Sequence, residues 1–162
     1  MRPGSERTPE MTTQTLRPAT TTATATATKS TARNVNLTAV TISAFRVVVC
    51  FMFVCHGLQG FGVFGGIDGA GTGVPVGSWP GWYASVIELV GGLLVLLGVA
   101  TRPAAIVCSG AMAFAYFTVH QQLALLPVQN MGEPAALYSW IFLLIAVLGP
   151  GSITLASVLR RK

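Results

Sequence analysis

The sequence predicts an all-α membrane protein, in which four transmembrane helices form a bundle and both chain termini lie in the cytoplasm. Three observations lead to this fold class. Of the 162 residues, 52% are hydrophobic and only 9% are charged, whereas a soluble domain carries about a quarter charged residues. Four apolar segments each approach the roughly 20 residues that span a bilayer core. Finally, Lys and Arg gather at the chain ends and in one short connection.

The net charge of +5 belongs to the two ends of the chain, not to a folded basic face. A nucleic-acid-binding module carries its basic residues on one face of a folded domain. Here the basic residues flank an apolar body, which is typical of membrane proteins. We therefore expect the lipid bilayer, and no nucleic acid, as the partner of the apolar body.

Residues 1–34 are predicted to form a disordered, Thr/Ala-rich cytoplasmic tail. Threonine supplies 11 of the first 33 residues, and such low-complexity sequence cannot bury apolar surface. The membrane domain is expected over residues 35–159, and residues 160–162 form a basic C-terminal end.

The membrane domain is predicted to contain helices at about 37–57, 83–100, 103–120 and 134–156. The third opens at Pro103, because proline is favourable at a first helical position. Gly149-Pro150-Gly151 follows the fourth apolar run and is expected to kink or stop that helix. Residues 152–159 then either complete the fourth span or lie along the membrane interface.

The connections between the helices predict the orientation. Thr101-Arg102-Pro103 is short enough to form only a tight hairpin, and it carries a positive charge. The long loop over residues 60–82, with nine of the 18 glycines, and the shorter stretch over residues 121–133 contain no Lys or Arg. Because positive residues favour the cytoplasmic side, four spans with both termini in the cytoplasm satisfy all of these regions.

Two charged residues, Arg46 and Glu88, lie within predicted spans. Each costs about 2.5–3.5 kcal/mol at the membrane centre if it faces lipid, so both are expected to face the bundle interior. Opposite charges make a mutual ion pair the expected arrangement. Such a pair would either fix helix packing and register or take part in binding a polar or redox-active ligand.

The predicted topology gathers further polar side chains in the outer half of the bundle, where they would form a polar pocket. None shows a short metal-ligand spacing such as HxxxH, so we expect no metal site. With Arg46, these residues are the candidates for binding a ligand head group or relaying protons: His56, Gln59, Glu88, Tyr116, His120 and Glu133.

Small residues on the second helix are predicted to let neighbouring backbones come close. Gly91, Gly92 and Gly98 are the packing positions. Three cysteines, Cys50, Cys55 and Cys108, lie in apolar runs and are interpreted as small apolar thiols, since an odd number disfavours a disulfide framework.

A family resemblance rests on a run of residues in the second predicted helix and on shorter matches elsewhere. The run is Ile87-Glu88-Leu89-Val90-Gly91-Gly92-Leu93-Leu94, continuing to Gly98, Thr101, Arg102 and Ala105. The shorter matches are Arg46, His56-Gly57-x-Gln59, Met112-x-x-x-Tyr116-x-x-x-His120 and Gly149-Pro150-Gly151. Together they cover roughly residues 42–151 and resemble the DoxX family.

The resemblance implies a small, multi-pass protein of the bacterial plasma (inner) membrane. Members are associated with quinone-linked sulfur oxidation and with a membrane oxidoreductase complex that contains superoxide dismutase and a sulfurtransferase. It therefore implies an accessory or quinone-linked subunit of an oxidoreductase system, related to redox, sulfur or oxidative-stress chemistry, with a quinone as ligand and soluble oxidoreductases as partners.

Other functions fit the same residues. The chain could be a non-catalytic adaptor that recruits soluble partners, a small transporter or a lipid-binding protein, and its glycine-rich helix faces also suit self-association. Catalytic turnover does not follow from the sequence; an enzyme of this length would need an intramembrane site.

Overall fold

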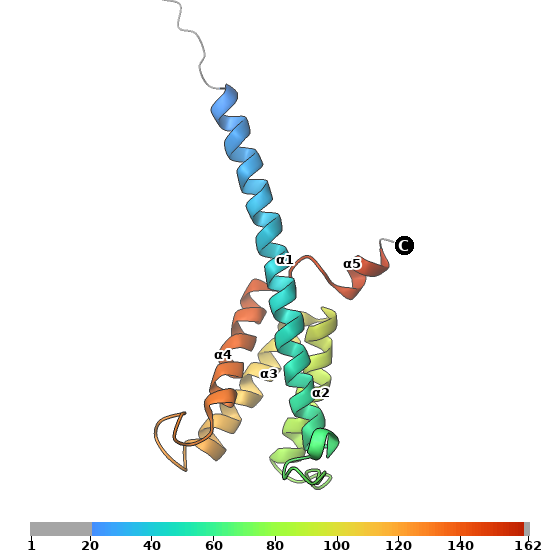
Figure 1. The fold of residues 1–162 in the computed structure, drawn as a ribbon, viewed down its shortest axis with the longest axis vertical. Coiled ribbons are helices and arrows are strands. Elements are labelled where there is room, and N and C mark those ends of the chain that lie inside the picture. The colour runs from blue at the N-terminus through green and yellow to red at the C-terminus, as the bar shows by residue number, and fades with distance from the viewer. Residues whose placement is uncertain (1–20, 161–162) are drawn as a thin grey trace, which may run out of the picture. The chain divides into compact units, whose positions relative to one another are not determined.

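The computed structural model describes residues 21–160, with side chains from Leu37 onward, and its regular elements are helices joined by loops (Figure 1). Between these residues there is no β-strand, only an isolated bridge between Gly66 and Thr72. The chain divides into two units, with the boundary between Asn34 and Val35. The second unit carries every side chain considered below.

Helix α1 (Thr21–Gly60) begins well upstream of the predicted position 37 and ends three residues beyond the predicted 57. The alternating Ala and Thr residues before Leu37 therefore continue the helix where an irregular tail is predicted. Alanine is the strongest helix former, and no proline follows Pro18 in this region. Residues 1–20 of the predicted tail lie outside the described residues.

Helix α2 (Gly81–Leu97) and helix α3 (Thr101–Ala115) are joined by three residues. The turn lies at Gly98–Ala100 and not at Thr101-Arg102-Pro103, so the predicted hairpin position is wrong. Gly98 adopts the left-handed conformation (φ 73°) and closes α2, as glycine commonly does after a helix. Pro103 fits inside the first turn of α3, because amide groups there have no partner within the helix.

The polypeptide continues from α3 as one π-helical turn, η2 (Tyr116–His120). The long loop between α1 and α2 holds a short 3-10 turn, η1 (Val63–Gly65). Asp68 orders this loop by accepting hydrogen bonds from the amides of Ala70 and Thr72 at 2.9 and 3.1 Å.

Helix α4 (Glu133–Leu148) ends before the Gly-Pro-Gly sequence, and α5 (Leu155–Leu159) is a separate helix. The prediction of one helix over 134–156 is therefore wrong. Gly149 has φ 85°, outside the helical region, and proline at position 150 cannot continue the hydrogen-bond pattern. A capping box between Thr154 and Ser157 starts α5.

The core forms where α3 packs against both α2 and α4, and where α1 packs against α2 and α4. The ring of Phe53 on α1 lies 4.4 Å from that of Phe142 on α4. Cys50 and Cys108 are free, buried members of this core, as the sequence predicts. The buried cluster consists of Cys50, Phe53, Val95, Ala104, Ala105, Cys108, Met112, Phe142, Ile145 and Ala146.

Large apolar side chains also cover the outside of the helices. Phe51 on α1 is 61% exposed and Val147 on α4 is 68% exposed, which fits contact with lipid better than with water. Leu37–Gly60 and Thr101–His120 are long and apolar enough to cross a membrane, whereas α2 and α4 are shorter apolar helices. The all-helical prediction is confirmed; the count of four spans and the cytoplasmic termini stay predictions.

Candidate functional site

Two glycines bring α1 and α2 into close contact. A methyl group at Gly57 would lie 2.8 Å from the backbone nitrogen of Leu89 and 3.0 Å from Cβ of Glu88. One at Gly60 would lie 2.0 Å from Oγ of Ser85. Since real side chains do not approach so closely, both positions require glycine at this helix separation. The contact places Glu88 level with the last turns of α1.

The Glu88 carboxylate meets His56 across this contact. Oε2 of Glu88 lies 2.9 Å from Nδ1 of His56. The Glu88 side chain is 6% exposed, whereas the His56 side chain is 55% exposed. A buried carboxylate needs a partner to offset its desolvation, and a carboxylate that accepts from one ring nitrogen fixes the orientation of the ring. The pair thus presents an oriented, half-exposed imidazole above a buried acid.

A cavity of about 340 Å³ lies beside this pair. Its size falls near the lower end of the range for small-molecule sites. Three of the predicted site residues line it together: His56, Gln59 and Glu88. The other lining residues come from the end of α1, the first turns of α2 and the loop between them: Gly60, Ile67, Val74, Gly81, Ala84 and Ser85.

Arg46 lies elsewhere, so the expected ion pair between Arg46 and Glu88 is wrong. The guanidinium is buried and donates to the backbone carbonyls of Val95, Leu96, Pro150 and Ile153. Two of these carbonyls belong to the last turn of α2, where helices leave carbonyls without internal partners and favour a positive charge. Arg46 therefore caps α2 and ties the segment after α4 to α1.

The expectation that both charges face the interior is confirmed. Arg46 is 1% exposed and Glu88 is 4% exposed. The two charges contact different parts of α2, since Arg46 meets its C-terminal turn and Glu88 lies near its middle.

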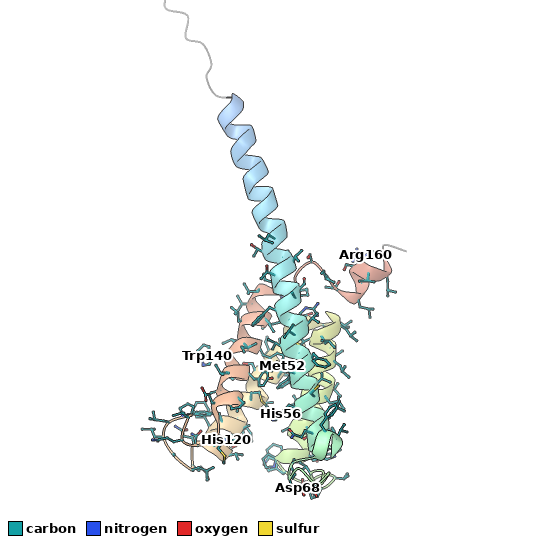
Figure 2. All side chains as sticks on the ribbon, viewed as in Figure 1. Met52, His56, Asp68, His120, Trp140 and Arg160 are labelled. Atoms are coloured by element: carbon teal, nitrogen blue, oxygen red, sulfur yellow. The ribbon has the colours of Figure 1, made fainter. Side chains whose placement is uncertain are left out.

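The remaining outer-end candidates do not join the His56–Glu88 pair. His120 Nδ1 lies 3.1 Å from the carbonyl oxygen of Asn130, and the ring of Tyr116 packs against Phe117. Glu133 is exposed at the first position of α4. Figure 2 shows His56 and His120 toward the same end of the helices but on separate elements.

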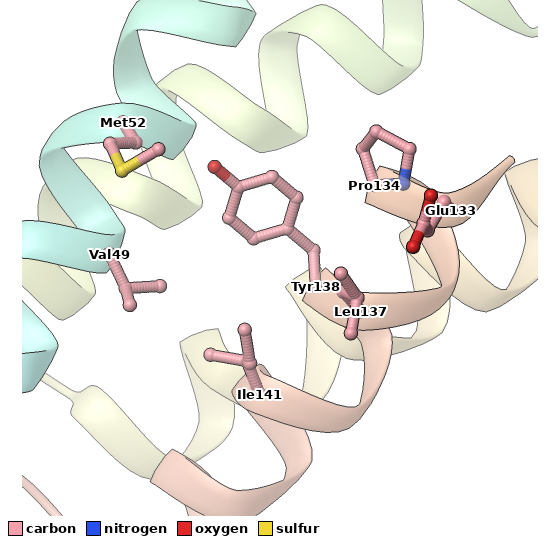
Figure 3. A pocket seen from close by; sticks show the side chains of 7 residues that line it. All are labelled: Val49, Met52, Glu133, Pro134, Leu137, Tyr138 and Ile141. Atoms are coloured by element: carbon pink, nitrogen blue, oxygen red, sulfur yellow. The ribbon is translucent and has the colours of Figure 1, made fainter. Parts of the chain in front are cut away.

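Glu133 lies at one end of an apolar cavity of about 410 Å³ between α1 and α4. In Figure 3, Leu137, Tyr138 and Ile141 of α4 face Val49 and Met52 of α1. This cavity shares no lining residue with the His56–Glu88 cavity, so the predicted outer pocket is divided into separate spaces.

The predicted packing glycines lie at different contacts. A methyl group at Gly91 would lie 2.5 Å from Sγ of Cys108 on α3, and one at Gly92 would lie 2.9 Å from Val54 on α1. Gly98 faces Thr154 in the segment before α5. Among residues with described side chains, no group of three or more His, Cys, Asp or Glu is arranged to hold a metal ion.

Ser85 and the loop residues Ile67 and Val74 also line the site, and the sequence did not predict them. The spacing Gly57-x-x-Gly60 next to His56 was an available signal, because small residues three apart mark one face of a close helix contact. The loop residues carried no signal, since their position depends on how the glycine-rich segment folds back over α2.

Comparison with known proteins agrees with the resemblance seen in the sequence. The sequence model of the DoxX family matches residues 41–121. A protein of Haemophilus influenzae, described as uncharacterized, is 38% identical over 124 residues, which cover 75% of this chain and 92% of that relative. No solved structure matches. With half of its length matched by the family model and a relative of this similarity, the chain belongs to the DoxX family, whose members are membrane proteins.

Proposed function

We propose that this protein is a multi-pass subunit of a bacterial plasma-membrane oxidoreductase system, and that it binds the polar head of a quinone in the cavity beside His56 and Glu88. The observation that carries the proposal is the buried carboxylate paired with a half-exposed imidazole, inside a polar cavity between otherwise apolar helices. Ionisable groups in such surroundings are costly and are characteristic of functional sites.

The residues of the cavity fit a quinone head. Its carbonyl oxygens accept hydrogen bonds, and the Gln59 amide of the cavity can donate one. The Ser85 hydroxyl already donates to the carbonyl of Gly81 at 3.1 Å. When Nδ1 of His56 donates to Glu88, the second ring nitrogen is left for the ligand: a neutral ring accepts there from the hydroxyl of a reduced quinone, and a protonated ring donates there to a quinone carbonyl. A bound quinone would supply electron and proton transfer between membrane enzymes. Glu88 orients the imidazole and holds the proton on Nδ1.

The proposed role is accessory, because a separate oxidoreductase, soluble or membrane-bound, would supply the electrons. The cavity lies at the ends of α1 and α2 and beside the long loop. A ligand entering from the outer leaflet of the bilayer therefore reaches the histidine before the buried carboxylate.

The test is to purify the protein in mild detergent and measure the quinone that is retained per protein molecule. We expect quinone with the wild type, and its loss in Glu88→Gln and His56→Leu. Glu133→Gln is the matched control, since it removes an exposed carboxylate outside the cavity. A wild type that retains no quinone and binds none when it is added would overturn the proposal and favour the adaptor function.

The proposal includes the predicted orientation, with four spans and both termini in the cytoplasm. Its basis is that the loop over residues 60–82 has no Lys or Arg. In a variant without native cysteines, Ala70→Cys is expected to react with a membrane-impermeant maleimide in intact cells, because Ala70 is exposed in that loop. Reaction only after permeabilisation would reverse the orientation.

A further inference from the structure

A second cavity adjoins the His56–Glu88 cavity and differs from it in chemistry. It lies between α2 and α3, measures about 440 Å³ and is lined mainly by apolar and aromatic side chains. On α2 it is bounded by Tyr83 and Ile87, and on α3 by Val107 and Phe114.

The two cavities meet at Gly81 and Ala84, which line both. These residues precede Glu88 by seven and four positions, so all three lie on one face of α2. Glycine has no side chain and alanine has only a methyl group. No large side chain of α2 therefore stands at the boundary between the polar and the apolar space.

We propose that the cavity between α2 and α3 holds the apolar tail of an amphiphile whose head group lies beside His56 and Glu88. This inference rests on the proposed function, and it narrows the ligand to a lipophilic quinone with a tail. The head would meet the ion pair, and the chain would pass over Ala84 into the apolar cavity, because the side chain of Val74 packs against Gly81.

An aromatic rim supports an apolar occupant over a polar one. The Trp79 ring lies 5.7 Å from that of Tyr83 and 5.6 Å from that of Phe114, measured between centroids. Trp79 is nevertheless 72% exposed. A chain in the cavity would cover part of this apolar surface, and burial of apolar surface is the main source of affinity for such a ligand.

The cavity between α1 and α4 (Figure 3) provides a matched comparison. It has a similar volume and is also apolar, but it shares no lining residue with the His56–Glu88 cavity. A tail attached to a head at Glu88 has no shared boundary through which to enter it.

Gly110 on α3 allows the tail cavity to be filled without disturbing the fold. It lines the cavity, and a methyl group added there would meet no atom within 4 Å. Gly110→Leu should therefore enter open space and leave the His56–Glu88 pair unchanged. Leu137→Trp, at an exposed position of the α1/α4 cavity, is the matched filling variant.

The experiment compares two probes: decylubiquinone and the tailless dimethoxy-methyl-benzoquinone head. Binding is measured with the full chain in lipid nanodiscs for the wild type and both variants. We expect Gly110→Leu to weaken the binding of decylubiquinone by about tenfold or more and to leave the binding of the tailless head unchanged. Leu137→Trp should change neither probe.

Each other outcome overturns the inference. If only Leu137→Trp weakens the binding of decylubiquinone, the tail lies between α1 and α4. If neither variant weakens it, the tail stays in the lipid. Equal weakening of both probes by Gly110→Leu would show a general disturbance of the site. A wild type that binds neither probe would instead refute the proposed function, so the two failures are distinguishable.

Discussion

Nδ1 of His56 lies 2.9 Å from Oε2 of Glu88, and this pair joins α1 to α2 where glycines allow the two helices to touch. Arg46 has no part in it, because its guanidinium is occupied by backbone carbonyls of the C-terminal turn of α2 and of the segment after α4. The two buried charges of the membrane domain are therefore satisfied separately, one by a side chain and the other by the backbone.

Double-mutant cycles should separate these two sites. His56→Leu and Glu88→Gln are expected to be coupled, since each leaves the partner unpaired. Measured membrane couplings average about 0.6 kcal/mol and reach about 1.7. Arg46→Met and Glu88→Gln should instead be additive within about 0.5 kcal/mol, because they share no partner. Unfolding in detergent measures both cycles, and coupling between Arg46 and Glu88 would contradict the structure.

Arg46→Met should be strongly destabilising. It removes the donor to four backbone carbonyls. The carbonyl of Val95 keeps the amide of Gly98 as a donor, and each of the other three that stays buried without a partner costs about 1–3 kcal/mol. We also expect faster proteolysis within residues 149–156, because Arg46 holds this segment through Pro150 and Ile153. Arg160→Met, at an exposed position, is the control. An unchanged cleavage rate in Arg46→Met would show that Ser43, which bonds the amide of Ile153, suffices to hold the segment.

Gly57→Ala should destabilise the protein by about 1–3 kcal/mol, the usual cost of overpacking. Its methyl group would meet the backbone of α2, which cannot move aside as a side chain can. Gly110→Ala is the matched control, since its methyl group meets open space and alanine favours the helix. Thermal unfolding of the two variants tests the close contact; equal stability would mean that α1 and α2 are not so near.

The loop between α1 and α2 should respond to acid through Asp68. Hydrogen bonds from the Thr72 side chain, and then from the amides of Ala70 and Thr72, lower the pKa of the Asp68 carboxyl. A lowered pKa means that the stabilisation is complete above the ordinary value of about 3.9 and is lost as the pH falls through the folded-state pKa.

The amide NMR signals of Ala70 and Thr72 report this titration. We expect a midpoint below the ordinary aspartate value in the wild type and no titration of these signals in Asp68→Asn. A midpoint at or above the ordinary value would show that the loop hydrogen bonds do not persist in solution.

The sequence predicted the helical class and the inward direction of Arg46 and Glu88, because the cost of exposing charge to hydrocarbon does not depend on the details of packing. It did not predict their partners. From position 46 to position 56 is ten residues, or about 15 Å of helix. Whether Arg46 or His56 lies opposite Glu88 therefore depends on how far α2 is shifted along α1. Close packing at Gly57 and Gly60 determines that shift.

The helix ends illustrate the same limit. Gly149-Pro150-Gly151 signalled a break, yet the predicted fourth helix ran past it because the residues beyond are apolar. Their apolar character is explained by a separate short helix, α5, with its own cap. The sequence also did not predict that the outer polar residues lie in different cavities, since this depends on side-chain packing around His120 and Glu133.

The most direct test of the central claim is to locate the head of a bound quinone. The purified protein is incubated with a ubiquinone analogue that carries a photoreactive azide on its ring, illuminated, digested and analysed by mass spectrometry. We expect cross-links within residues 56–60 and 81–88, which contain most of the residues that line the His56–Glu88 cavity, and their loss in Glu88→Gln. Cross-links confined to Leu137–Ile141 in the α1/α4 cavity, or cross-links unchanged in Glu88→Gln, would contradict the central claim.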